Sequence, residues 1–422
     1  MKIASGAGLA VISPSTFAAP GFAADRSDQF AESYAGTLFL CFNASGGWDP
    51  THLCDAKTNP ITNLKPEEVE TEAGLTYPAY FDPEIYGEGT GAFIPEFFRK
   101  HAGRLRVING IDMQTNGHDS GSRHVWSGRL SDGAPTLAAY MAATFDPTLP
   151  MAFLTFGGFS DTEGIAAQTR AGNVSALTRV AYPQRIDPNN AESGFHSPRA
   201  YELIQEAQRA RDLALLAGQK LPRINHSVSA LYAARSGSNE LRLLQEYLPE
   251  SFSDNGLQRS VQLALAAYQA GITISVNLNL GGFDTHGNHD RSHVPRLNEL
   301  LQGIDFAWEE ATARGVADRV VIVVGSEFGR TPGYNDGNGK DHWSVSSMML
   351  MGQGIPPGVV GATTPEHRAI GVTSSLDLDP NGTLKILPGH VHRALRDRFA
   401  FGDDNDLASL FPLNVDRLPV LG

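Results

Sequence analysis

One stretch of uninterrupted apolar sequence, residues 320–324, limits the folds open to this chain more than any other feature. All five of its side chains are apolar, so neither face of a strand formed here would suit water. The stretch therefore predicts a strand that is buried on both faces, as in a parallel sheet. A second strand-like run, 272–280, precedes it, and residues 295–314 between the two have apolar side chains at helical spacing. A strand, a helix and a strand in this order predict two parallel strands joined by a right-handed crossover.

Residues that bind metals or anions follow both of these strands. Asp284 and His286 come after the first strand, Glu327 and Arg330 after the second, and a glycine-rich loop then leads to His342. Ligands of parallel sheets bind beyond the carboxyl ends of the strands, so we expect the first four of these side chains to meet at one edge of the sheet, where His342 joins them if its loop folds back. Mixed carboxylate and imidazole ligands suit zinc, manganese or iron, and also calcium or magnesium if carboxylates dominate.

Two earlier segments place further candidates at the same edge. Residues 36–42 predict a first strand, and the loop after it contains Asp49. The strand predicted over 105–111 is followed by four candidate catalytic residues, His118, Ser120, Ser122 and His124. They open a probable helix, whose N-terminus favours an anion, and a serine there is a candidate nucleophile. Serine is also a common helix cap, which is the alternative reading of either hydroxyl.

The charge balance restricts the partners. The chain of 422 residues has 33 Lys and Arg against 46 Asp and Glu, a net charge of −13. This charge argues against nucleic acid and anionic membranes as partners, since nothing would offset phosphate repulsion. An anionic substrate would need a local positive centre, either an arginine or a metal ion.

The organisation along the chain predicts a leader and one large domain. Residues 1–24 have a single lysine, an apolar segment and then small residues, which resembles an export signal, although an ordinary N-terminus is the alternative. We therefore expect a periplasmic or secreted protein without a membrane span. Residues 25–422 are expected to form one α/β domain, with a helical insertion at about 160–255.

Four residues of metal-binding types are expected to lie outside the site. Cys41 and Cys54 are the only cysteines, and they either form a disulfide or remain unpaired. Two cysteines cannot complete a tetrahedral thiolate site, so a metal must rely on carboxylate and imidazole.

His289 and His293 are expected at the solvated start of the helix that follows Asp284 and His286.

Four motifs together resemble a known family. Gly281-Gly-Phe-Asp-Thr-His286, Ser326-Glu-Phe-Gly-Arg-Thr331, Asp341-His-Trp343 and Gly46-Gly-Trp-Asp49 are similar to signatures of the DUF1501 family. That family consists of bacterial exported proteins placed in the alkaline phosphatase and sulfatase superfamily. The resemblance implies an alkaline phosphatase-like three-layer sandwich with a mostly parallel central sheet. Its members commonly carry twin-arginine (Tat) signals, but no twin arginine is present here.

The superfamily implies a metal-dependent hydrolase of phosphate or sulfate esters. Carried over to this chain, its late Asp and His pair corresponds to Asp284 and His286, and its final His corresponds to His342. Its Asp-His pair falls at Glu327 and Phe328, and because Phe328 cannot bind a metal, one ion is expected in place of two. The superfamily's hydroxyl nucleophile has no clear match, and the Cys-x-Pro-x-Arg pattern of sulfatases is missing.

The resulting hypothesis combines the residues with the resemblance. The predicted ligands of the divalent ion are Asp284, His286, Glu327 and His342, with Asp49 as a further candidate. Arg330 would neutralise the charge of an anionic small-molecule or polysaccharide ester, and water or a serine would attack it while His118 or His124 transfers protons.

Two other classes of protein are alternatives to this hydrolase. The first is a catalytically degenerate superfamily member that acts as a cell-surface or periplasmic binding protein, and Phe328 favours it. The second, a cofactor-dependent oxidoreductase, is disfavoured because no Gly-x-Gly-x-x-Gly follows a strand.

Overall fold

The computed structural model describes residues 34–58, 61–171, 184–187, 190, 192–218 and 243–422. Within them, eight strands form one sheet in the order β12-β4-β11-β8-β1-β7-β5-β6. Their bounds are β1 Leu38–Ser45, β4 Leu105–Asp112, β5 Phe153–Thr155, β6 Gln168–Arg170, β7 Ser275–Gly281, β8 Val320–Gly325, β11 Val345–Gly352 and β12 Gly358–Val360. All neighbouring strands are parallel except where β11 pairs with β4 and β8. The prediction of a mostly parallel sheet is confirmed.

The strand–helix–strand unit is formed by β7, the helix α11 (His289–Ala313) and β8. β7 and β8 are parallel, as predicted, but they are not neighbours, because β1 lies between them. Phe39 of β1 is opposite Ser275 of β7 on one side and Val321 of β8 on the other. The first seven residues of β1 are buried, which suits a strand at the centre of a sheet.

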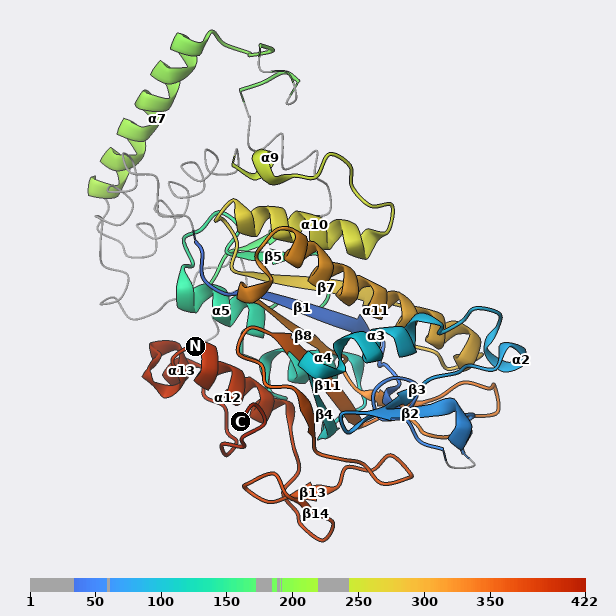
Figure 1. Cartoon of the computed structure of the whole chain (residues 1–422). Coiled ribbons are helices and arrows are strands. Elements are labelled where there is room, and N and C mark those ends of the chain that lie inside the picture. Colours follow the sequence, from blue (N-terminus) through green and yellow to red (C-terminus); the bar gives the residue numbers. More distant parts are fainter. Residues whose placement is uncertain (1–33, 59–60, 172–183, 188–189, 191, 219–242) are drawn as a thin grey trace.

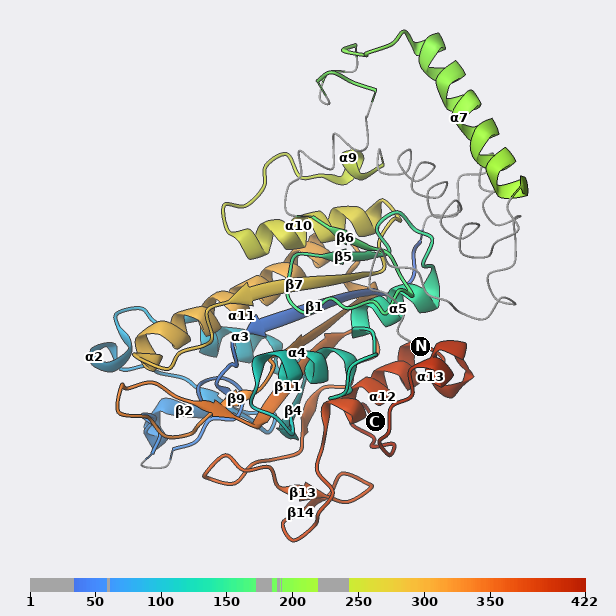
Figure 2. The same cartoon turned by 180° about the vertical axis from the view of Figure 1, so that it is seen from behind.

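Helices cover both faces of the sheet (Figures 1 and 2). The helices α3 (Phe93–His101), α10 (Gly256–Gln269) and α11 lie on one face, and α4 (His118–Ser127), α5 (Leu137–Phe145) and α12 (Pro388–Phe399) lie on the other. Successive side chains of β1 point to opposite faces. Leu40 therefore shares a core with Leu297 of α11, whereas Phe39 shares a second core with Val391 of α12. This arrangement is the predicted three-layer α/β sandwich.

The remaining elements connect these layers. They are the helices α2 (Pro83–Tyr86), α7 (Pro198–Gly218), α9 (Leu244–Tyr247) and α13 (Asp406–Leu410), and the strand pairs β2 (Val69–Glu72) with β3 (Leu75–Pro78), β9 (Gly329–Arg330) with β10 (His342–Trp343), and β13 (Gly371–Val372) with β14 (Leu378–Asp379). α7 stands apart from the layered body (Figure 1). The limits of the insertion at 160–255 and of the domain at 25–422 stay predictions, and the leader lies outside the described residues.

The two cysteines do not pair. Both Cys41 and Cys54 are buried free thiols, and burial raises the pKa of Cys41 to about 12. Cys41 belongs to the core beneath α12, whereas Cys54 belongs to the core beneath α11, so the sheet separates them. Among the helices of the described residues, none combines the length and the apolar character that crossing a bilayer requires.

Truncating the central strand should destabilise the whole sheet. Leu40 is fully buried, so Leu40→Ala is expected to lower the free energy of unfolding by about 2–5 kcal/mol, because lost burial and an unfilled cavity add. The matched control is Leu410→Ala, since 47% of the Leu410 side chain is exposed and its loss should change stability little. Urea unfolding of both variants is the measurement. Equal midpoints would contradict the central place of β1.

Candidate metal centre

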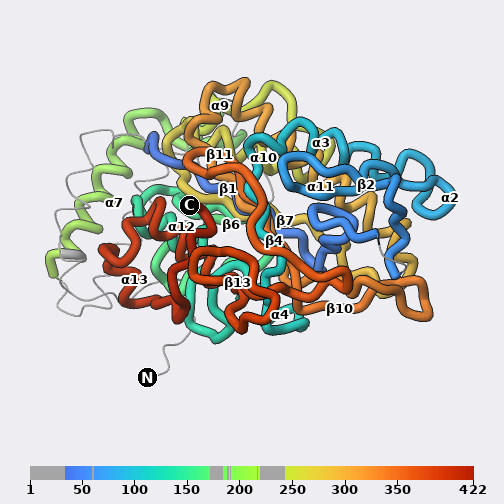
Figure 3. Tube along the Cα trace, turned by 60° about the horizontal axis from the view of Figure 1, so that its bottom comes forward, coloured from blue at the N-terminus to red at the C-terminus, as the bar shows by residue number. Residues whose placement is uncertain are grey.

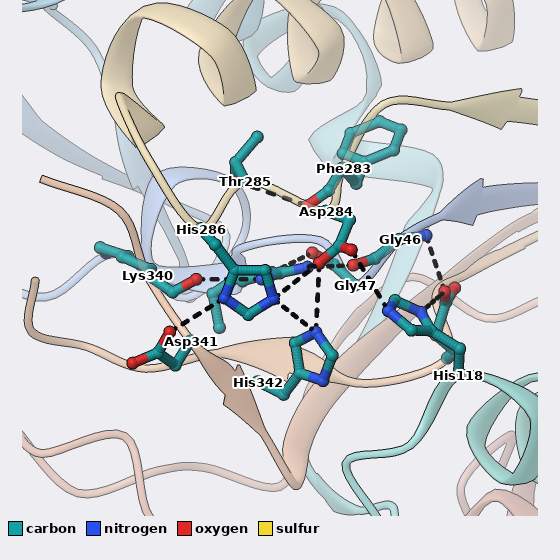
Figure 4. Close-up of polar contacts among 12 residues, drawn as sticks. Gly46, Gly47, His118, Phe283, Asp284, Thr285, His286, Lys340, Asp341 and His342 are labelled. Carbon is teal, nitrogen blue, oxygen red and sulfur yellow. Dashed lines mark hydrogen bonds and ion pairs between the residues drawn. The ribbon is translucent and has the colours of Figure 1, made fainter. Parts of the chain in front are cut away.

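The loops after β1, β7 and β8 meet at the carboxyl end of the sheet (Figure 4). Gly46 and Gly47 allow this close approach, with φ values of 125° and 87°. A Cβ atom at Gly46 would lie 2.4 Å from the Asp284 amide nitrogen, and one at Gly47 would lie 2.2 Å from the Phe328 ring. Neither distance is sterically possible, so only glycine fits both positions without moving the loops.

Three of the predicted ligands converge on a single point. The Nε2 atoms of His286 and His342 are 3.0 Å apart, and each lies 3.1 Å from Oδ1 of Asp284. These separations are close to the edge of about 3.3 Å that a tetrahedron has when its metal–ligand bonds are 2.0–2.1 Å. His342 reaches the point from β10, which lies beside the start of α4 (Figure 3).

In His286 and His342, the second ring nitrogen, Nδ1, fixes the orientation of the imidazole. His286 donates through Nδ1 to the carboxylate of Asp341 at 2.9 Å, and His342 donates through Nδ1 to the backbone oxygen of Asn116 at 2.7 Å. Both acceptors lack a proton to give, so in the neutral rings the Nε2 atoms carry lone pairs. Two imidazole lone pairs and a carboxylate oxygen therefore face one another, which is repulsive unless a cation lies between them. This pattern of held histidines is typical of metal sites.

His118 and Glu327 form a pair beside this point. His118 donates through Nδ1 to Oε1 of Glu327 at 2.9 Å, and its Nε2 lies 3.4 Å from Oδ2 of Asp284. His118, Asp284 and His342 have ligand atoms within 4.8 Å of one another, and this group includes neither His286 nor Glu327. Oε1 of Glu327 also accepts from the Gly46 amide, whereas its buried Oε2 has no hydrogen-bond partner among the described residues, so the role of Glu327 as a ligand stays a prediction.

The position after Glu327 is filled by an aromatic ring. Phe328 is fully buried, and its ring centroid lies 4.3 Å from that of His342 and 5.0 Å from that of His118. An apolar ring here supplies packing where a second metal ion would need a ligand. The number of ions stays a prediction.

Arg330 joins the loops of the site to Asp284. Its guanidinium is fully buried and donates to the backbone oxygens of Gly46, Gly47 and Lys340, and to Asp284 at 2.7 Å. These bonds hold Asp284 in place, and the predicted contact of Arg330 with an anionic substrate stays a prediction. Burial alone would raise the pKa of Asp284, but the hydrogen bond and the positive charge of Arg330 lower that pKa to about 2.

A cleft of about 670 Å³ opens beside the convergence point. Asp284, His118 and Glu327 line it together with Ser122 and Arg123. The Arg123 side chain is 24% exposed and pairs with the exposed carboxylate of Asp132 at 2.7 Å. Arg123 was not singled out from the sequence, because nothing in its local pattern separates it from the other arginines.

Two predicted catalytic residues do not reach this cleft. Ser120 lies 2.6 Å from the Thr115 hydroxyl and donates to the Gly117 oxygen, so it braces the start of α4. His124 is 3% exposed and donates to the backbone oxygen of Met113, and burial lowers its pKa. Both lie on α4, but a helix presents only one face to the cleft, and Ser122 lies on that face.

Asp49 lies in a separate, fully buried cluster. Its Oδ2 is 2.7 Å from His52, 3.0 Å from His289 and 2.7 Å from the ammonium of Lys340. The three side chains Asp49, His52 and His289 offer metal-ligand geometry. The ammonium of Lys340 already supplies a positive charge there, however, and it draws the pKa of Asp49 well below its usual value against the effect of burial. Asp49 therefore does not join Asp284.

The expectation that His289 and His293 are solvated is wrong. Both are fully buried, because α11 begins six residues earlier than predicted and its first turns pack beneath the loop that carries Asp284. Burial lowers the pKa of His289 to about 4 and lowers the pKa of His293 well below its ordinary value.

These features define the class of protein. It is an α/β sandwich with a cluster of potential metal ligands at the carboxyl ends of its strands. The chain belongs to the DUF1501 family, described as a protein of unknown function, whose profile matches residues 132–400. The family resemblance inferred from the motifs is thereby confirmed. No curated protein sequence matches the chain.

Several solved structures share a distant likeness. One is Ps i-CgsB in complex with k-i-k-neocarrahexaose, at 9% identity and a TM-score of 0.40, covering 92% of this chain and 75% of that one. Another is the alkaline phosphatase from the Antarctic bacterium TAB5, at 9% and 0.34, covering 77% and 94%. A third is the PsFucS1 sulfatase from Pseudoalteromonas sp., at 10% and 0.33, covering 78% and 66%. Likeness of this extent carries no argument about chemistry, which must come from the site itself.

Removing one ligand should empty the site. His342→Ala deletes one of three converging donors, so the purified variant is expected to lose most of the metal that the parent protein retains after dialysis. The control is His196→Ala, because His196 is exposed and distant in sequence from every ligand. Elemental analysis measures both. Equal metal content in the two variants would refute the site.

The buried histidines should make the metal-free protein sensitive to acid. His289 has a pKa of about 4 in the folded chain against 6.5 when exposed, so the unfolded state takes up the proton first. Stability present above pH 6.5 is therefore lost as the pH falls towards 4, by on the order of 1–3 kcal/mol. Urea unfolding across this range is the measurement, and a midpoint that rises on acidification would contradict it.

Proposed function

We propose that this protein is a metal-dependent hydrolase of phosphate or sulfate esters. The observation that carries the proposal is the convergence of His286, His342 and Asp284 beside an open cleft. Three protein ligands with a fourth position left open are typical of catalytic metal sites, whereas structural sites use four.

The ligand types favour zinc over the other candidate ions. Two imidazoles and one carboxylate suit zinc, while calcium and magnesium prefer shells of oxygen atoms. A zinc ion bound here would act as a Lewis acid towards an ester oxygen and make water easier to ionise. Manganese remains compatible with the same donors.

The cleft offers one arginine to an anionic ester, although the carboxylates of Asp119, Asp284 and Glu327 also line it. Arg123 lies on its wall, and an anion would compete for this guanidinium with Asp132, whose side chain is 87% exposed and therefore weakly held. α4 also begins at the cleft with His118, so its N-terminal dipole favours a negative charge there. In a chain with a net charge of −13, this local positive charge is what would attract the substrate.

His118 is the residue we assign to proton transfer. It faces the cleft, and Glu327 holds its ring through Nδ1, which leaves Nε2 to exchange a proton. Water attacks phosphorus or sulfur, the bond to the ester oxygen breaks, and His118 gives a proton to that oxygen. The proton that the attacking water releases returns to His118, so the residue ends as it began.

The cleft also holds a hydroxyl, that of Ser122. We assign the attack to water, and Ser122→Ala tests this choice. If that variant alone abolishes turnover while metal content is retained, Ser122 is the nucleophile in place of water. Export to the periplasm or beyond belongs to the same proposal and is supported only by the composition of residues 1–24.

Two variants should show that proton transfer and substrate binding depend on different residues from metal binding. His118→Ala is expected to retain the metal but lose about 10²–10⁴-fold in kcat, because only the acid is missing. Arg123→Gln is expected to raise KM by roughly 10–100-fold with a smaller change in kcat, since it removes a charged hydrogen bond to the substrate.

The measurement is a panel of aryl phosphate, phosphonate and sulfate esters assayed with added divalent metals. Turnover of any one of them by the parent protein, with a lower kcat in His118→Ala and a higher KM in Arg123→Gln, supports the proposal. Metal binding without turnover of any ester would replace it with the alternative, a degenerate family member that binds without catalysis.

A further inference from the structure

A closed ring of hydrogen bonds lies directly beneath the metal-type site. It passes through Asp49, His293, Thr285 and His289 and returns to Asp49. Each member except Thr285 is fully buried, and Thr285 is 7% exposed. No part of the proposed hydrolysis uses these residues, so the ring calls for its own explanation.

The direction of every bond in the ring follows from one backbone amide. The Asp49 N–H donates to Nε2 of His293 at 2.9 Å, so the proton of this neutral imidazole is on Nδ1. That Nδ1 donates to the Thr285 hydroxyl at 2.9 Å. The hydroxyl then directs its own proton to Nδ1 of His289 at 2.8 Å. His289 in turn donates through Nε2 to Oδ2 of Asp49 at 3.0 Å.

In this one arrangement of protons, every donor in the ring of hydrogen bonds has an acceptor. The lowered pKa values of His289 and His293, caused chiefly by burial, keep both rings neutral at neutral pH, which this arrangement requires. A buried network in which every donor has an acceptor holds its members rigidly, whereas one missing group leaves its neighbours unpaired.

Thr285 connects this ring to the site. It lies between Asp284 and His286 in the chain, and its backbone oxygen accepts from the amide of Lys340 at 3.1 Å. Lys340 precedes Asp341 and His342, and its ammonium binds Asp49 at 2.7 Å. The two segments that carry the three ligands are therefore joined at Thr285 and Lys340, above the ring.

We infer that Thr285 is the positioning residue of the metal site, whose hydroxyl fixes the backbone that aims Asp284 and His286. The inference rests on the proposed function in taking the convergence point as a metal site. It adds that the geometry of the site depends on a group that touches neither metal nor substrate. Groups that orient metal ligands typically contribute 10–100-fold to metal affinity.

The test compares Thr285→Val with Thr285→Ser. Valine has nearly the shape of threonine but no hydroxyl, so zinc affinity measured by competition with a chelator is expected to fall roughly 10–100-fold. Serine keeps the hydroxyl and should bind zinc as the parent protein does. If Thr285→Val does not fold, Thr285→Ala removes the same hydroxyl with less crowding and carries the comparison.

A stability control separates positioning from general loss of structure. Leu301→Ala removes a fully buried side chain further along α11, so it should lower the unfolding midpoint while leaving zinc affinity unchanged. Equal zinc affinity in Thr285→Val and the parent would overturn the inference and leave the metal site intact. Failure of the parent protein to bind zinc or manganese would instead overturn the proposed function.

Discussion

The guanidinium of Arg330 is the interaction on which the site depends. It is fully buried and binds backbone oxygens of the loop after β1 and of the segment before β10, as well as the carboxylate of Asp284 after β7. A buried charge of this kind is stable only when its donors are satisfied, so it requires all three segments to be in place at once. The ligands that these segments carry are thereby brought together.

The layers of the fold make this arrangement possible. The loops that follow parallel strands lie at the same edge of the sheet. The strands β8, β1 and β7 stand in this order in the sheet, so their loops lie side by side. The glycines at 46 and 47 then let the loops approach to distances that no larger residue permits. Beneath them, the ring through Thr285 holds the backbone from the other side. The site is thus supported from its cleft side by Glu327 and from its interior by Asp49 and Lys340.

The sequence predicted the local features of this site well and its long-range contacts poorly. Asp284 and His286 follow a strand-like run, and their place needs only the rule that parallel strands end at one edge, whereas His342 joins them through the glycine-rich loop before it. The pairing of His118 with Glu327 joins residues 209 positions apart, which no local pattern encodes. The inward position of Arg330 was missed for the same reason, because its partners in the loop after β1 are distant in the sequence. β11 was also missed, since its antiparallel course beside β8 is decided by pairing in the sheet.

The central claim is that one divalent cation binds between Asp284, His286 and His342. The most direct measurement is anomalous diffraction at the zinc edge from crystals of the protein grown with zinc. The account predicts one strong peak within bonding distance of His286 Nε2, His342 Nε2 and an oxygen of Asp284. A peak at the Asp49 cluster in place of this one, or no peak near either cluster, would contradict it.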